Sequence, residues 1–155
     1  MTEFIRVEPI VSGTAEGKVV RLVEPLSFWG GVDPATGTII DVHHPQCGLR
    51  TSGVILVMPR ARGSSSSSSV LLECVRLGTA PSAIVLGSVD PILVAGAAAA
   101  QEIYGHGPAI FETARVDAFA DTAMVAIDVD GRVRRLDSDE RERGDEGQQQ
   151  LGRRA

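Results

Sequence analysis

The sequence predicts a single α/β domain with a mixed β-sheet and two main helices. Of its 155 residues, 43% are hydrophobic and 23% are charged, which is typical of a globular chain. Short apolar runs recur along the chain in the manner of strands, and two longer segments carry helix start and stop signals. A chain of this length has room for one domain with an ordinary hydrophobic core.

We place this domain at residues 1–136 and predict a disordered, charged tail at residues 137–155. The tail sequence, DSDERERGDEGQQQLGRRA, holds almost no apolar side chains. Such a segment cannot bury enough apolar surface to offset the entropy lost on ordering.

Strands are predicted where β-type residues form short runs between turn residues. In order, these runs are FIRVEPI (4–10), GKVVRLVE (17–24), VILVMP (54–59), AIVLG (83–87), AIFE (109–112), AMVAID (123–128) and, as an added edge strand, GRVRRL (131–136). The run at 54–59 is apolar without interruption, which predicts a strand buried on both faces.

Two helices are predicted between these strands. The first begins in the serine run of residues 64–69 and continues through VLLECVRL, with Gly78 placed as its C-terminal cap. The second has Asp90 as its N-cap and Pro91 at its first position, and it ends at Gly105. The resulting order β-β-β-α-β-α-β-β describes mixed strands and not a repeating doubly wound fold.

A long, turn-dense loop region is expected at residues 25–50. Loops of this length in compact domains are usually functional or disordered, and the Trp, Phe and Ile content here favours order. The run Phe28-Trp29-Gly30-Gly31 suits a pocket wall or an interface anchor. Asp33 is a turn residue by default. The adjacent His43 and His44 would point to opposite sides of a strand, which favours one solvated and one hydrogen-bonded histidine over a shared metal ion.

The strongest local signal lies between the strand at 54–59 and the first helix. Apolar runs flank residues 64–69 on both sides, so these serines occupy a strand-to-helix turn and not an interdomain linker. A helix N-terminus presents unpaired N–H groups and about half a positive charge. Arg60 and Arg62 could add cations suited to a carboxylate or phosphate. The pattern therefore predicts an anion cradle, although a serine-rich cap with surface arginines is the simpler alternative.

Other classes of function are disfavoured. A formal charge of −5 argues against nucleic-acid binding. Neither Cys47 nor Cys74 belongs to a C-x-x-C pair, so we expect no metal site on this chain. The N-terminus lacks signal-peptide features and the weakly polar run at 91–100 is too short to span a bilayer, so we expect a cytoplasmic protein without membrane contact.

Three stretches resemble the small, swivelling subunit of the aconitase X family. They are PLSFWGGVDPATGTIIDVHHPQCG, VILVMPRARGSSSSSSVLLECVRLGTAPSAIV and DPILVAGAAAAQEIYG. The resemblance as a whole extends over about residues 12–111. The order and spacing of Gly-Gly-Val-Asp-Pro, of the Met-Pro to Gly-Ser turn and of Asp-Pro-Ile make the resemblance specific.

The resemblance implies a swivelling β/β/α domain with a mixed sheet or barrel-like core. It also implies an aconitase X-type large subunit as partner, which carries an iron or iron-sulfur centre, with no cofactor bound by this chain alone. Members of the family dehydrate hydroxy acids. Bacterial members with a serine-rich turn resemble cis-3-hydroxy-L-proline dehydratase, whereas archaeal relatives act on 5-phosphomevalonate.

The resemblance also implies roles for particular residues. Gly63-Ser64-Ser65 matches the aconitase-type Gly-Ser-Ser turn, whose first serine is the catalytic base, and that serine corresponds to Ser64. Aconitases place an arginine shortly after this pair, where this chain continues with serines, and Arg62 could supply that cation from the other side. The residues expected to bind a small carboxylate substrate are Arg62, Gly63, Ser65, Gly30, Gly31, Asp33 and His44.

Three functions therefore stay open at this point. The first is the small subunit of a hydro-lyase that converts cis-3-hydroxy-L-proline to a pyrroline-2-carboxylate. The second is the small subunit of a 5-phosphomevalonate dehydratase. The third is a non-catalytic anion-binding or scaffold module, in which the serine turn only caps a helix.

Overall fold

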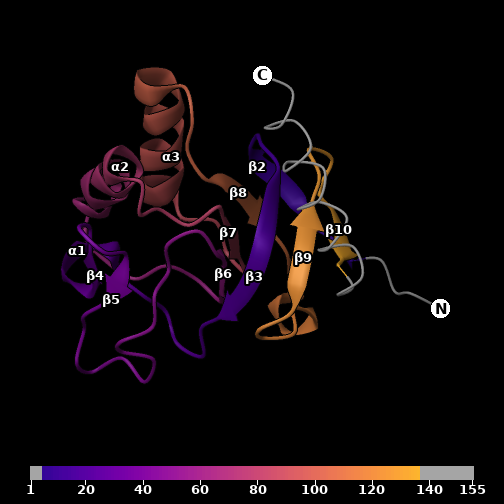
Figure 1. Cartoon of the computed structure of the whole chain (residues 1–155), viewed down its shortest axis with the longest axis horizontal. Coiled ribbons are helices and arrows are strands. Elements are labelled where there is room, and N and C mark those ends of the chain that lie inside the picture. The colour runs from indigo at the N-terminus through magenta and orange to yellow at the C-terminus, as the bar shows by residue number, and fades with distance from the viewer. Residues whose placement is uncertain (1–4, 137–155) are drawn as a thin grey trace, which may run out of the picture.

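The computed structural model in Figure 1 describes residues 5–136. Its elements in chain order are β1 (Ile5–Arg6), β2 (Glu8–Val11), β3 (Ala15–Arg21), α1 (Phe28–Gly31), β4 (Val32–Asp33), β5 (Thr38–Ile39), β6 (Ile55–Met58), α2 (Ser67–Leu77), β7 (Ala83–Leu86), α3 (Pro91–Tyr104), β8 (Ala109–Glu112), the 3₁₀ turn η1 (Val116–Ala118), β9 (Met124–Ile127) and β10 (Arg132–Arg135).

Eight strands form one mixed sheet in the order β1-β10-β9-β3-β6-β7-β8-β2. The pairs β3–β6, β6–β7 and β7–β8 are parallel, and the other pairs are antiparallel. The two ends of this order, β1 and β2, are joined in the chain through Val7 alone. The sheet is therefore nearly closed into a barrel, which confirms the predicted barrel-like core with two main helices.

The central strands bury both of their faces. In β6, Ile55 and Val57 belong to the cluster inside the barrel, whereas Leu56 and Met58 belong to a second cluster beneath the helices. Side chains alternate between the two faces of a strand, so a strand buried on both sides must be apolar at every position. This explains why the run at 54–59 carries no polar residue.

Helices α2 and α3 pack against each other on one side of the molecule, and strands β9 and β10 of the sheet lie away from them on the other side (Figure 1). The predicted caps are confirmed. Asp90 Oδ1 accepts a hydrogen bond from the Ile92 N–H at 2.8 Å, and Gly78 and Gly105 end their helices in the left-handed conformation. No helix within residues 5–136 is long and apolar enough to cross a membrane.

Three sequence expectations need correction. The run at 4–10 is not one strand, because β1 pairs with β10 whereas β2 pairs with β8. The run at 131–136 is not an edge, because β10 lies between β1 and β9. The loop at 25–50 contains the short turn α1 and the hairpin β4–β5. The predicted tail at 137–155 lies outside the described residues, and the domain boundary at 136 stays a prediction.

Candidate functional site

The serine turn connects the carboxyl end of β6 to the start of α2. Gly63 lies at the bend with a φ of +129°, a conformation that side-chain-bearing residues rarely adopt. A Cβ at this position would also collide with the Ser27 side chain. Gly63 is exposed and Ser64 is half-buried, so the bend faces the surface and not the hydrophobic interior.

The hydroxyls of the serine run have different environments. Ser64 Oγ accepts a hydrogen bond from the Ser66 N–H at 3.2 Å. Ser67 is buried, and its Oγ accepts the Trp29 N–H at 3.1 Å. Ser68 Oγ donates to the Ser65 carbonyl at 3.0 Å. Ser67 thus serves the packing of α1 against α2, whereas Ser64 presents a hydroxyl at the bend itself.

The segment Ser27–Gly31 lies directly beside this turn. Its backbone is tied on both sides of Trp29, because Ser27 Oγ donates to the Trp29 carbonyl at 3.0 Å and Ser67 accepts the Trp29 N–H. The Arg62 N–H donates to the Leu26 carbonyl at 3.1 Å, which joins the two segments further. The structure therefore brings Ser27 and Trp29 together with the serine turn, and Gly30 and Gly31 follow Trp29 in the chain.

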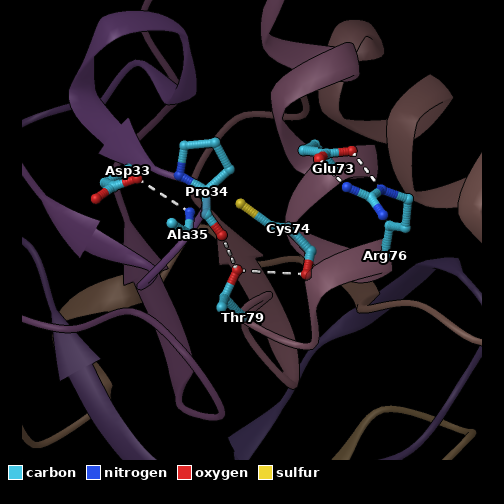
Figure 2. A network of polar contacts seen from close by, with 7 residues as sticks. All are labelled: Asp33, Pro34, Ala35, Glu73, Cys74, Arg76 and Thr79. Carbon is cyan, nitrogen blue, oxygen red and sulfur yellow. Dashed lines mark hydrogen bonds and ion pairs between the residues drawn. The ribbon is translucent and has the colours of Figure 1, made fainter.

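Asp33 is placed near the other end of α2. Its Oδ1 accepts the Ala35 N–H at 3.0 Å in a tight turn, and the Thr79 hydroxyl donates to the carbonyl of Pro34 at 2.6 Å (Figure 2). Thr79 follows the C-terminal end of α2, a helix about 16 Å long at 1.5 Å per residue. Asp33 is therefore not brought together with Ser64, and its carboxylate serves the turn.

His44 is buried with both ring nitrogens hydrogen-bonded. Nε2 lies 3.2 Å from the Glu24 carbonyl, and Nδ1 accepts the Gln46 N–H at 3.1 Å. This assigns the proton to Nε2 and the lone pair to Nδ1. His43 is exposed, so the pair divides into one solvated and one hydrogen-bonded ring as predicted. His44 fastens the loop, and neither nitrogen is left for a ligand in this arrangement.

Positive charge borders the serine turn. Arg60 and Arg62 are exposed, and neither guanidinium forms a hydrogen bond or ion pair with another described residue. By contrast, Arg76 on α2 pairs with Glu73 at 2.6 Å. Hydrogen bonding to Arg76 lowers the pKa of the Glu73 carboxyl from its ordinary value. The two arginines at the turn are therefore available to an anion or to an acidic partner.

The buried Cys74 is not a nucleophile candidate. Burial raises the pKa of the Cys74 thiol and keeps it protonated within the core beneath the helices. Cys47 is exposed, and its Sγ lies 3.5 Å from the Ile39 carbonyl. Among residues 5–136, no three His, Cys, Asp or Glu side chains gather in a way that could hold a metal ion. The described residues therefore do not fit an iron centre.

Two cavities of the molecule lie away from the serine turn. One of about 420 Å³ is lined by residues of β3, β9 and β10, including Glu16 and Asp128. The other, of about 250 Å³, lies between the end of α2 and residues 106–108. Neither of these two cavities is lined by a residue of the turn, and Gly63 and Ser65 are exposed, so the turn itself lies at the molecular surface.

Sequence reasoning missed Ser27 and Ser67 as residues that shape the site. Ser27 packs against Gly63, and Ser67 holds Trp29 across 38 positions of the chain. Nothing in the local pattern marks Ser27, and Ser67 is one of six consecutive serines. The one local signal is the neighbouring run Phe28-Trp29-Gly30-Gly31, which by itself predicts a pocket wall or an interface anchor.

The sequence profile of the aconitase X swivel domain matches residues 4–135. Over 97 residues the chain is 47% identical to cis-3-hydroxy-L-proline dehydratase of Pseudomonas aeruginosa, a match that covers 63% of this chain and 17% of that protein. Over 94 residues it is 45% identical to the phosphomevalonate dehydratase small subunit of Methanopyrus kandleri, which covers 59% of this chain and 70% of that subunit.

A solved structure supports the same relationship. The crystal structure of Thermococcus kodakaraensis aconitase X in its holo-form superposes with a TM-score of 0.79 at 32% identity. The superposition covers 88% of this chain and 100% of that one. Over 96 residues the chain is also 44% identical to cis-3-hydroxy-L-proline dehydratase of Hypocrea jecorina, a match that covers 62% of this chain. Both hydroxyproline dehydratases are much longer proteins, since the chain matches only 17% and 16% of their lengths.

Proposed function

The chain belongs to the aconitase X swivel domain family, and from this premise we propose that it is the small subunit of a heteromeric hydro-lyase. The enzyme dehydrates a hydroxy acid, and we assign cis-3-hydroxy-L-proline as the substrate and a pyrroline-2-carboxylate as the product. Ser64 supplies the base in a site shared with an aconitase X-type large subunit.

One observation carries this proposal. The Gly63-Ser64 bend lies at the surface between a fully buried strand and a helix N-terminus, with Arg60 and Arg62 exposed beside it. Helix N-termini and arginine side chains both favour a bound carboxylate. The positive end of the α2 dipole and the two arginine side chains can hold a small carboxylate, and the Ser64 hydroxyl lies beside them as the base.

The reaction balances as a loss of water. Ser64 Oγ removes the proton from the carbon next to the carboxylate, and the electron pair left behind forms a double bond to the neighbouring carbon. The hydroxyl on that carbon leaves with its bonding pair and takes up a proton to become water. We assign the iron centre to the large subunit, because the described residues of this chain hold no cluster of metal ligands, and we assign the acid for this departure to the same subunit.

Ser64 needs more than its helix to become a base. A helix dipole contributes at most about 2 kcal/mol, equivalent to roughly 1.5 pKa units. An alcohol resembles water, whose pKa lies far above neutral pH. The Ser66 N–H that donates to Ser64 Oγ favours the alkoxide, as do nearby cations. The remaining activation requires exclusion of water, which the large subunit would provide on closing over the turn.

We predict that Ser64→Ala in the assembled enzyme lowers kcat by at least about 10²- to 10⁴-fold, the usual contribution of a general base. Folding and binding of the large subunit should stay intact, because Ser64 is only half-buried. Steady-state kinetics on the purified complex measures this. Ser69→Ala is the matched control, since Ser69 is an exposed serine in the first turn of α2. An active Ser64→Ala enzyme beside an inactive Ser66→Ala enzyme would transfer the role to Ser66.

A second substrate is tested in the same experiment. The match to a phosphomevalonate dehydratase small subunit extends over 70% of that subunit, so 5-phosphomevalonate is the alternative substrate. The complex should dehydrate cis-3-hydroxy-L-proline, and selective turnover of 5-phosphomevalonate would change the substrate but keep the hydro-lyase. A complex that binds carboxylates and turns over neither compound would favour the non-catalytic module.

A further inference from the structure

The loop that packs along α2 exposes an unusual amount of apolar surface. The structure describes ten exposed large hydrophobic residues, and half of them fall within residues 23–49. This apolar loop surface consists of Val23, Trp29, Ile40, Val42 and Leu49. Trp29 is 59% exposed and Val42 is 79% exposed, although large apolar side chains are normally withdrawn from water.

Hydrogen bonds join the segments that carry these side chains. The Ile40 N–H donates to the Gly31 carbonyl at 2.9 Å, which places Ile40 beside the Trp29 segment. The Ile39 N–H donates to the Leu49 carbonyl at 2.8 Å. The Val23 N–H donates to Gln46 Oε1 at 2.8 Å. The segments that carry Val23, Trp29, Ile40 and Leu49 are therefore held together by hydrogen bonds, and Val42 follows Ile40 by two positions.

The surface is also rigid where it meets the serine turn. The N–H and the carbonyl of Trp29 are both held, by Ser67 and by Ser27, while the indole is exposed. A tryptophan on a fixed backbone loses little conformational entropy on binding, and Trp is enriched among the residues that dominate binding energy. Exposed Arg60 and Arg62, which lack partners among the described residues, border it with positive charge.

We propose that this apolar loop surface is the docking site of the large subunit, with Trp29 as its anchor. The inference rests on the proposed function. The long hydroxyproline dehydratases match this chain over only 17% and 16% of their lengths, whereas small subunits match over most of theirs. A partner that corresponds to the rest of the long proteins is the occupant, and this surface requires an apolar patch on it that faces Trp29.

Docking at this surface would place the partner over the active turn. The Trp29 N–H is hydrogen-bonded to Ser67, the first residue of α2, and Ser64 lies three residues before Ser67 in the chain. A partner seated on Trp29 therefore covers the Gly63-Ser64 bend and excludes water from it. The same contact that joins the subunits completes the site.

The test measures the affinity of the large subunit from the same genome by titration calorimetry. We expect Trp29→Ala to weaken binding at least about 25-fold, the effect of losing a strong anchor residue. Val42→Asp, which places a charge on the same surface, should weaken it by a similar factor. The control is Ile103→Ala, at an equally exposed side chain (62%) on α3, which should change affinity less than about twofold.

The outcomes separate this inference from the proposed function. Tight binding by both loop variants would overturn the docking site and leave the hydro-lyase intact. Failure of the unaltered chain to bind the large subunit would overturn both. A dimer of this chain alone that Trp29→Ala dissociates would assign the surface to a second copy and would also overturn the inference.

Discussion

At the scale of single residues, the geometry of the serine turn depends on Gly63. Its positive φ and its contact with Ser27 leave no space for a Cβ. The contact also fixes the distance between the Trp29 segment and the start of α2. A residue with no side chain thus determines where the neighbouring hydroxyl of Ser64 lies.

We predict that Gly63→Ala lowers the free energy of unfolding by about 1–3 kcal/mol, through backbone strain and the collision with Ser27. Urea unfolding of the purified chain measures the loss. Gly48→Ala is the control, because Gly48 has a φ of +94° but nothing within 4 Å of its Cβ position. Its loss of stability should therefore reflect backbone strain alone. Adding Ser27→Ala to Gly63→Ala should recover part of the loss, and no recovery would contradict the collision.

Tertiary contacts, and not residue identity, decide the role of each serine. Six consecutive serines look equivalent in the sequence, yet Ser67 is buried against Trp29 and Ser64 stands at the bend. Their difference comes from a residue 38 positions away and not from their neighbours. Sequence reasoning reached Ser64 only through the resemblance to the Gly-Ser-Ser turn.

At the scale of elements, α3 positions the start of α2 through close contact at Gly96. A Cβ on Gly96 would lie 2.9 Å from the Ser68 carbonyl oxygen and 3.0 Å from the Ser68 Cα. These are backbone atoms of the serine run, so they cannot move aside without shifting the helix. The small-residue composition of α3 therefore serves its close packing against α2.

Gly96→Ala should therefore destabilise the protein although alanine is the better helix former. Overpacking costs about 1–3 kcal/mol, against a gain in helix propensity of about 1 kcal/mol, so we expect a net loss near 1 kcal/mol. Thermal unfolding checks the sign. Ala95→Leu is the control, because Ala95 is exposed on the same helix and its replacement should change stability by less than about 0.5 kcal/mol. A more stable Gly96→Ala protein would show that the two helices can separate freely.

At the scale of the whole molecule, the barrel is closed by a strand that divides in two. In β1, Ile5 pairs with Val133, and in β2, which begins after the single intervening residue Val7, Pro9 pairs with Phe111. This division joins the two ends of the eight-stranded order. The helices α2 and α3 and the loop of residues 25–50 lie on one side of this nearly closed barrel, and the serine turn lies at the surface on the same side (Figure 1).

Because the serine turn lies at the molecular surface, we predict that the purified chain alone does not turn over substrate. Water at the site screens the charges and leaves the serine far from ionised. Adding the large subunit should produce activity that rises with complex formation and saturates with it, which a titration of activity against partner concentration measures. Dehydration of cis-3-hydroxy-L-proline by this chain in the absence of any partner would contradict a shared site.

The sequence by itself determined what is encoded within a few neighbouring residues. The caps at Asp90, Gly78 and Gly105, the strand buried on both faces at 54–59 and the strand-to-helix position of the serines all follow from local rules of hydrogen bonding and burial. Only the tertiary structure decided the division of the first strand, the interior position of β10 and the attachment of Trp29 to Ser67. These features depend on partners 38 or more positions apart, and a local pattern contains no information about which distant groups will meet. The same reason explains why Asp33 and His44, both conspicuous in the sequence, serve the loop through backbone contacts whereas an unmarked Ser27 shapes the turn.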